Sequence, residues 1–188
     1  MDRHLVVGLG NPEPKYARNR HNVGFMVVDR LAEASRVDVT RSKFKGIYGT
    51  GTIGSCPVVL LKPLTFMNLS GQSVSPARSF FGIDAEHIVV IHDELDLAFG
   101  TLRLKMGGGH AGHNGLRSMV AELGTADFVR LRVGIGRPAR GSVSDYVLAD
   151  FDAEQQPWLP DLLDRAADAV KLALSEGPRK AMNTVNAA

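Results

Sequence analysis

Two stretches of this 188-residue chain concentrate side chains that can do acid–base chemistry. They are "IHDELD" at residues 91–96 and "GGGHAGHNG" at residues 107–115, which together hold imidazoles, carboxylates and an amide. An imidazole oriented by a carboxylate can remove a proton from water, and amide side chains can place the water or hold an oxyanion. His21 and Asp93 could serve as that base and carboxylate, although their spacing alone does not show that they meet. The amides that could assist them are Asn11, Asn68 and Asn114.

Two other kinds of hydrolytic chemistry fit the sequence less well. Metal-assisted hydrolysis needs ligands on a fixed frame, but the HxxH of residues 110–113 lies in a glycine loop, and neither HExxH nor CxxC occurs. A serine nucleophile would need a GxSxG turn, which the chain lacks, and Cys56 has no catalytic partner beside it in the sequence. General-base hydrolysis without a metal is therefore favoured, and the other two classes remain alternatives.

The stretch "VVGLGNP" at residues 6–12 has the form of a nucleotide-binding start but lacks its chemistry. The dinucleotide fingerprint requires a third glycine where this chain has Glu13, whose charge would repel a pyrophosphate. Pro12 and Pro14 also remove backbone N–H donors where phosphate binding requires them. We therefore expect the glycine pair to end a strand tightly rather than to cradle a phosphate.

Composition places the chain among ordinary globular proteins, with 44% apolar and 22% charged residues. The single cysteine, Cys56, excludes an internal disulfide and fits a reducing cytoplasm. No apolar run approaches the roughly 20 residues of a membrane span, and the N-terminus lacks a signal-peptide core. The net charge is +2, with residues 151–188 negative and the rest positive, which suits an acidic ligand. The basic residues that gather in sequence are Arg18, Arg20, Arg41, Lys43 and Lys45, and then Arg130, Arg132, Arg137 and Arg140.

Hydrophobic periodicity and turn residues predict alternating strands and helices along the chain. Strands are expected at 4–10, 46–53, 57–63, 87–96, 100–109 and 128–138, and helices at 22–35, 71–82, 113–124 and 158–175, with a loop at 64–71. Asn22 is a plausible N-cap of the first helix, and Arg130 and Arg132 are expected on one face of their strand. This order predicts a single α/β domain over residues 1–188, a sandwich with a mixed, mostly parallel twisted sheet flanked by helices.

The polar clusters follow separate strands of this expected sheet. Asn11 follows the first strand, Asn68 follows the strand at 57–63, and Asp93 lies where the strand at 87–96 runs into a turn. Ligands of such sheets bind at the carboxyl ends of the strands. One shared cleft is therefore expected there.

Four motifs in order carry a resemblance to a known family. They are "VGLGNP…Y…R…RHNVGF", "KPLTFMNLSG", "IHDELDLAFGTLRLKMGGGHAGHNGLRS" and "FVRLRVGIGRP", and together they run to about residue 138. This pattern resembles bacterial-type peptidyl-tRNA hydrolase. The resemblance implies a monomeric cytoplasmic α/β enzyme without metal or cofactor. Such an enzyme hydrolyses the ester that joins a peptide to the terminal ribose of tRNA, and it engages the acceptor stem and CCA end.

The resemblance also assigns roles to matching residues. It implies that His21 is the catalytic base and that Asp93 orients it, with the helix N-terminus helping to keep the imidazole neutral. The remaining assignments are Asn11 and Asn68 on the peptidyl end, Tyr16 and Met67 lining the site, Asn114 placing water with His113 beside it, and Lys105 with Arg132 clamping the tRNA 5′-phosphate. Two positions depart from the pattern, since Glu13 and Ala111 stand where many relatives have glycine.

Two competing functions remain open at this point. Chloroplast splicing factors resemble this fold while serving as RNA-binding scaffolds, but the complete set of candidate catalytic residues favours an enzyme here. A small-molecule esterase is the other alternative, and the basic pair Lys105 and Arg132 argues against it.

Overall fold

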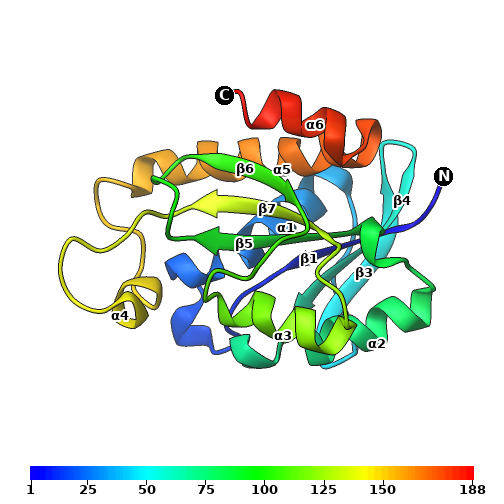
Figure 1. Cartoon of the computed structure of the whole chain (residues 1–188), viewed down its shortest axis with the longest axis horizontal. Coiled ribbons are helices and arrows are strands. Elements are labelled where there is room, and N and C mark those ends of the chain that lie inside the picture. The colour runs from blue at the N-terminus through cyan, green and yellow to red at the C-terminus, as the bar shows by residue number, and fades with distance from the viewer.

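A seven-stranded sheet with the strand order β2-β3-β4-β1-β5-β7-β6 forms the centre of the protein (Figure 1). The computed structural model describes residues 1–188. Its strands are β1 (His4–Gly8), β2 (Arg41–Lys43), β3 (Gly46–Ile53), β4 (Cys56–Pro63), β5 (Ile88–Glu94), β6 (Leu102–Met106) and β7 (Val129–Gly134). The central strands β4, β1, β5 and β7 are parallel, whereas β2, β3 and β6 pair antiparallel with their neighbours. The predicted fold, an α/β sandwich with a mixed, mostly parallel sheet, is confirmed.

Helices cover both faces of this sheet. Buried side chains of α1 (Val23–Ser35) and α5 (Leu159–Glu176) belong to the core on one face. Those of α2 (Gly71–Phe81) and α3 (Asn114–Leu123) belong to the core on the other. The helix α6 (Pro178–Val185) lies along α5, and the short α4 (Val143–Val147) lies beyond the arrowheads of β5 and β7 at the left of Figure 1. None of these helices has both the length and the apolar composition to span a bilayer.

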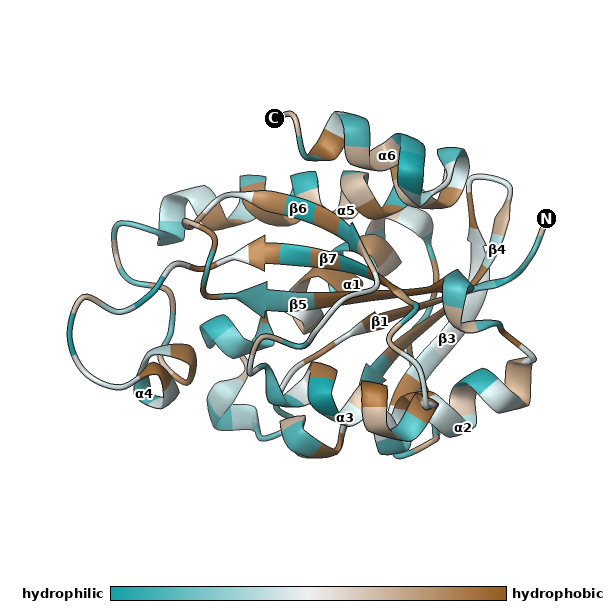
Figure 2. Cartoon of the chain, viewed as in Figure 1, coloured by the Kyte–Doolittle hydropathy of each residue, from teal (hydrophilic) through white to brown (hydrophobic).

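The central strands are apolar on both faces because each face is covered. In β1, Val6 packs into the core with α1 and α5, whereas Leu5 and Val7 pack into the core with α2 and α3. Alternate residues of a strand point to opposite faces, so a strand buried on both sides becomes a continuous apolar run. In Figure 2, β5 is brown along its first half and teal at its carboxyl end, where the polar residues of the site begin.

Two glycines bring α1 directly against the strand ends. A Cβ at Gly8 would lie 2.2 Å from the carbonyl oxygen of Gly24, and a Cβ at Gly24 would lie 2.5 Å from the carbonyl oxygens of Leu9 and Ile91. Side chains cannot be accommodated at such distances, so both positions require glycine. This close packing sets the start of α1, and with it His21, beside the carboxyl ends of β1 and β5. Gly8 thus ends β1, as expected, and the structure adds its role in helix–sheet packing.

The sequence missed three elements and overestimated the length of several strands. β2 has three exposed residues, and α4 has five residues, so neither shows a periodic pattern. α6 spans eight residues after Gly177 and is held by packing on α5 rather than by strong propensity. The strands expected at 87–96, 100–109 and 128–138 are shorter, because their ends turn into the loops that form the site.

Candidate active site

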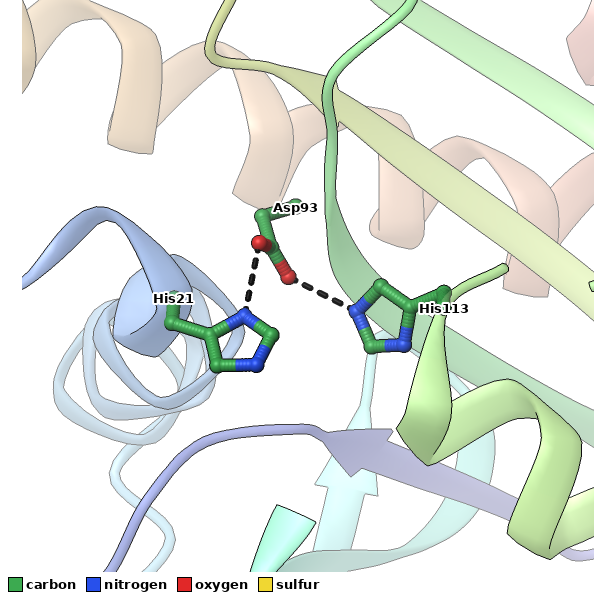
Figure 3. A group of neighbouring side chains, drawn as sticks. All are labelled: His21, Asp93 and His113. Carbon is green, nitrogen blue, oxygen red and sulfur yellow. Dashed lines mark hydrogen bonds and ion pairs between the residues drawn. The ribbon is translucent and has the colours of Figure 1, made fainter. Parts of the chain in front are cut away.

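The carboxylate of Asp93, near the end of β5, joins two imidazoles (Figure 3). Its Oδ2 lies 2.8 Å from His21 Nδ1, and its Oδ1 lies 2.8 Å from His113 Nε2. An ionised carboxylate only accepts hydrogen bonds, so both of these ring nitrogens carry the hydrogen. His21 comes from the 3-10 turn Arg20–Asn22 before α1, and His113 precedes α3. The structure therefore brings His21 and Asp93 together and adds His113 to the pair.

His113 is fully engaged by its neighbours. Its Nδ1 accepts hydrogen bonds from the backbone N–H groups of Gly115, at 3.1 Å, and Leu116, at 3.3 Å. The side chain is therefore the N-cap of α3, and this contact fixes the tautomer with hydrogen on Nε2. No ring nitrogen of His113 is left for a substrate. Its geometry suits holding Asp93 rather than moving protons.

His21 keeps one nitrogen free. Its Nε2 makes no hydrogen bond within the protein, and the residue lines a cavity at the carboxyl ends of the strands. Burial alone would lower the pKa of His21, but the charge and hydrogen bond of Asp93 outweigh burial and raise the pKa above the ordinary 6.5. The helix N-terminus is expected to help keep the ring neutral, but the pKa of His21 shifts the other way because Asp93 contacts the ring directly and carries a full charge.

Asp93 itself stays ionised despite its burial. Burial alone would raise the pKa of its carboxyl, but His21 and His113 hold that pKa well below its usual range. The neighbouring His92 is different, since complete burial lowers its pKa to about 3. His92 therefore stays neutral, and its Nδ1 donates to the Asp93 carbonyl oxygen at 2.8 Å. This places His92 in the framework beneath the site.

A cavity of about 860 Å³ opens in front of these side chains. Of the predicted site residues, those that line it are Asn11, His21, Met67, Asn68, Asp93, His113 and Asn114. The expected shared cleft at the carboxyl ends of the strands is thus present. Tyr16, in the turn Pro14–Tyr16, lies outside the lining, as do Lys105 and Arg132.

The amides of the cavity differ in how they are held. Asn68 and Asn114 are exposed and make no side-chain hydrogen bond within the protein, so both can bind a ligand. The Oδ1 of Asn11 accepts the backbone N–H of Glu13 at 3.1 Å, which leaves its Nδ2 as a donor. Met67 is buried in the 3-10 turn Met67–Leu69, which packs against α3, and it also lines the cavity.

Asn22 supports the site residue Asn11, a role that the sequence did not reveal. It occupies the N-cap position of α1, but its side chain does not cap the helix. Instead its Oδ1 accepts the Asn11 backbone N–H at 2.7 Å, and its Nδ2 donates to the Asn11 carbonyl at 2.9 Å. The predicted capping role is therefore wrong. The Asn22 side chain binds the backbone N–H and C=O of Asn11 and does not bind the first N–H groups of α1. No sequence signal distinguishes these two uses.

Lys105 and Arg132 lie on the edge pair β6–β7. Lys105 is opposite Arg130, and Arg103 is opposite Arg132, so all four share one face of the sheet. Arg132 Nε donates to Glu94 Oε1 at 2.9 Å, whereas Lys105 is exposed.

Arg130 lies on the same face of the sheet, but unlike Lys105 it is not exposed. It is buried, and its guanidinium donates to the carbonyl oxygens of Gly108, Gly109 and Ala126. The arginines from 130 onward therefore do not form one solvated basic patch. Arg130 supports the glycine loop instead.

One group of potential metal ligands coincides with this site. The ligand atoms of His21, Asp93 and His113 lie within 4.8 Å of one another. The two nitrogens that face Asp93 carry hydrogens in the arrangement above, so a metal ion there would have to displace both hydrogen bonds. In this structure the potential ligand atoms of His21, Asp93 and His113 that face one another are thus used for hydrogen bonds.

A family model described as peptidyl-tRNA hydrolase matches residues 5–188. The chain belongs to the peptidyl-tRNA hydrolase family. It is 52% identical over 187 residues to the peptidyl-tRNA hydrolase of Geobacter sp. (strain M21), covering 100% of both chains. It is also 52% identical to that of Sorangium cellulosum (strain So ce56) over 185 residues, covering 97% of this chain and 83% of the relative.

The fold agrees with a solved member of the peptidyl-tRNA hydrolase family. The crystal structure of peptidyl-tRNA hydrolase from Acinetobacter baumannii is similar with a TM-score of 0.92 at 45% identity, covering 98% of this chain and 94% of that one. The expected family and its hydrolysis of peptidyl-tRNA are confirmed at this level. The RNA-binding scaffold and the small-molecule esterase are therefore set aside.

Proposed function

We propose that this chain hydrolyses the ester between peptide and tRNA by general-base catalysis, with His21 as the base and Asp93 as the group that orients it. The carrying observation is that His21 donates from Nδ1 to the buried carboxylate while its Nε2 remains free in a residue that lines the cavity. A base needs this division, since one nitrogen fixes the ring and the other takes the proton.

The reaction follows from these positions. A water molecule gives a proton to His21 Nε2, and its oxygen attacks the ester carbonyl carbon to form a tetrahedral intermediate. When the intermediate collapses, the bond to the ribose oxygen breaks, and the imidazolium returns the proton to that oxygen. Asp93 stabilises the imidazolium between these steps. An activated ester needs no stronger nucleophile than this water.

The amides supply placement and charge stabilisation. Asn11 keeps its Nδ2 for the substrate, and Asn68 and Asn114 are unpaired at the cavity wall. We assign Asn11 and Asn68 to the peptidyl end, with Met67 below them, and Asn114 to the water. Tyr16 extends the approach to this wall, since it lies in the segment that joins Asn11 to His21.

The tRNA side of the substrate requires cations. Lys105 and Arg132 sit on adjacent strands and share a face, at diagonal positions that long side chains can span. The contact of Arg132 Nε with Glu94 fixes the guanidinium and leaves its other nitrogens free of protein carboxylates. This supports a clamp for the 5′-phosphate, with the acceptor stem alongside and the CCA end leading into the cavity.

The same proposal places the enzyme as a monomer in the cytoplasm, where translation produces its substrate.

The decisive test is release of an N-acetyl-aminoacyl group from tRNA by wild type and His21→Ala, each with and without EDTA. We expect wild-type turnover to survive EDTA and to vanish in His21→Ala. Turnover lost to EDTA and restored by a divalent metal would support the metal alternative. Turnover that persists in a folded His21→Ala would exclude His21 as the base.

A further inference from the structure

The side chain of Asn186 pairs with the edge strand β6 in the way a neighbouring strand would. Its Oδ1 accepts the backbone N–H of Leu104 at 2.8 Å, and its Nδ2 donates to the Leu104 carbonyl at 3.0 Å. β6 is the last strand of the sheet, so its outward backbone groups have no strand partner. One amide thus satisfies both of these groups.

The C-terminal helix delivers this amide. Asn186 directly follows α6, which lies along α5 and against β6 (Figure 1). Ala181 of α6 is completely buried, and this packing fixes the helix. The carbonyl of Ala188 also receives a hydrogen bond from Arg103 Nη1 at 3.4 Å. The end of the chain is therefore joined to β6 at two neighbouring residues.

Leu104 lies immediately before Lys105, so the strand backbone at Leu104 sets the direction of the Lys105 side chain. Leu104 is buried in the core, so the Lys105 side chain leaves the opposite face of the strand. A Cβ at Gly108 would lie 2.6 Å from Lys105 Cε and 2.8 Å from its Nζ. The end of the exposed Lys105 side chain therefore lies beside Gly108 of the glycine loop, and its position depends on how β6 and this loop are placed.

We propose that Asn186 is a positioning residue for Lys105. By holding the backbone of Leu104, it fixes the direction in which β6 presents the ammonium group to an RNA phosphate. The inference rests on the proposed function, in which Lys105 and Arg132 bind the 5′-phosphate of tRNA. It adds that α6, which carries no residue of the cavity, contributes to tRNA affinity.

The test measures preference for the 5′-phosphate. The substrates are N-acetyl-aminoacyl-tRNA with and without that phosphate, and the readout is the ratio of the two kcat/KM values. The variants are Asn186→Ala, Lys105→Ala and their combination, with Asn183→Ala as the matched control. Asn183 lies on the same helix but is exposed and makes no side-chain hydrogen bond.

We expect Asn186→Ala to reduce the ratio by about fivefold through KM, as is typical of coupled neighbours. Asn183→Ala should keep the wild-type ratio, and the double variant should resemble Lys105→Ala alone. If Lys105→Ala loses the preference but Asn186→Ala retains it, the positioning role is wrong and the clamp stands. If wild type shows no preference, or Lys105→Ala retains it, the proposed clamp itself is wrong and the inference falls with it.

Folding is controlled separately. Asn186→Asp changes the size of the side chain little and keeps an acceptor for the Leu104 N–H, but it places a carboxylate against the Leu104 carbonyl. We therefore expect Asn186→Asp also to lose the preference for the 5′-phosphate. Thermal unfolding and the rate on the dephosphorylated substrate identify any variant that is merely unfolded. A ratio that stays at the wild-type value in a folded Asn186→Asp overturns the proposal.

Discussion

His113 Nε2 donates to the oxygen of the Asp93 carboxylate that His21 leaves free, at 2.8 Å. The carboxylate therefore has one imidazole on each oxygen, and only the His21 ring offers a nitrogen to the substrate. This division separates a base from a residue that holds the orienting group. It also makes the role of His113 measurable apart from its helix cap.

Replacement of His113 by asparagine should separate the contact with Asp93 from the helix cap. Asparagine is a strong N-cap, so His113→Asn keeps an acceptor for the first turn of α3 but loses the donor to Asp93. We expect His113→Asn to lose about 1–3 kcal/mol of stability because a buried oxygen of Asp93 loses its donor, and we expect kcat to fall by about tenfold. His113→Ala should lose the cap as well, at about 1 kcal/mol. Thermal unfolding and steady-state kinetics distinguish the two, and full activity of a folded His113→Asn would exclude a role in holding Asp93.

The base and the orienting residue should differ in the size of their effects. His21→Ala removes the proton acceptor, so kcat should fall by about 10²–10⁴-fold. Asp93→Ala should cost less in kcat, because His21 Nε2 remains available although its ring is free to turn. Single-turnover rates of ester release measure both without interference from product release. Small and equal losses in the two variants would contradict the assigned roles.

The activity should depend on pH through His21. The neutral ring is the base, so kcat/KM should rise as pH increases through the pKa of His21. Asp93 raises that pKa above 6.5, so the midpoint of the rise should lie above 6.5 in wild type. Asp93→Asn removes the charge that raises the pKa, and the midpoint should move to lower pH. A midpoint that does not move in a folded Asp93→Asn would show that a group other than His21 controls the rise of kcat/KM with pH.

Asn22 should act through Asn11. Both hydrogen bonds of the Asn22 side chain go to the Asn11 backbone, and the residue is buried. Asn22→Ala should therefore lose about 1–3 kcal/mol of stability by leaving these groups unpaired. Its kcat/KM should fall, and Asn11→Ala should add little in the double variant, since the two act on one contact. Urea unfolding and kinetics of the three variants measure this, and strictly additive losses in kcat/KM would contradict it.

The order of the longer strands and helices followed from the sequence, but β2, α4, α6 and the individual contacts of the site did not. Continuous apolar runs such as that of β5 predict strands buried on both faces, and polar residues at their ends predict a shared cleft. The contact of His113 with Asp93 depends on how the glycine loop crosses between β6 and α3, and local periodicity carries no information on that path. The family resemblance paired His21 with Asp93, as the structure does, because it supplies tertiary information that spacing lacks.

The misjudged residues failed for a related reason. Asn22 occupies a position typical of a cap, yet a tertiary partner outweighs the local contact. Arg130 alternates like a surface arginine, but the loop at Gly108 folds over it and supplies carbonyl partners. The role of each residue depends on a hydrogen bond to a backbone group that is distant in the sequence, and the local sequence pattern does not identify that partner.

The clamp should appear as a salt-dependent contribution to tRNA affinity. Removal of one phosphate interaction lowers the slope of log K against log salt by about 0.7–0.9, so Lys105→Ala/Arg132→Ala should reduce the slope by about 1–2. Arg179→Ala/Lys180→Ala removes the same charge from exposed positions on α6 and is the matched control, because neither residue has a carboxylate partner. Fluorescence anisotropy with labelled tRNA over a range of salt concentrations gives both slopes. If the two double variants change the slope equally, net charge rather than the clamp determines tRNA affinity, and the assignment of Lys105 and Arg132 is wrong.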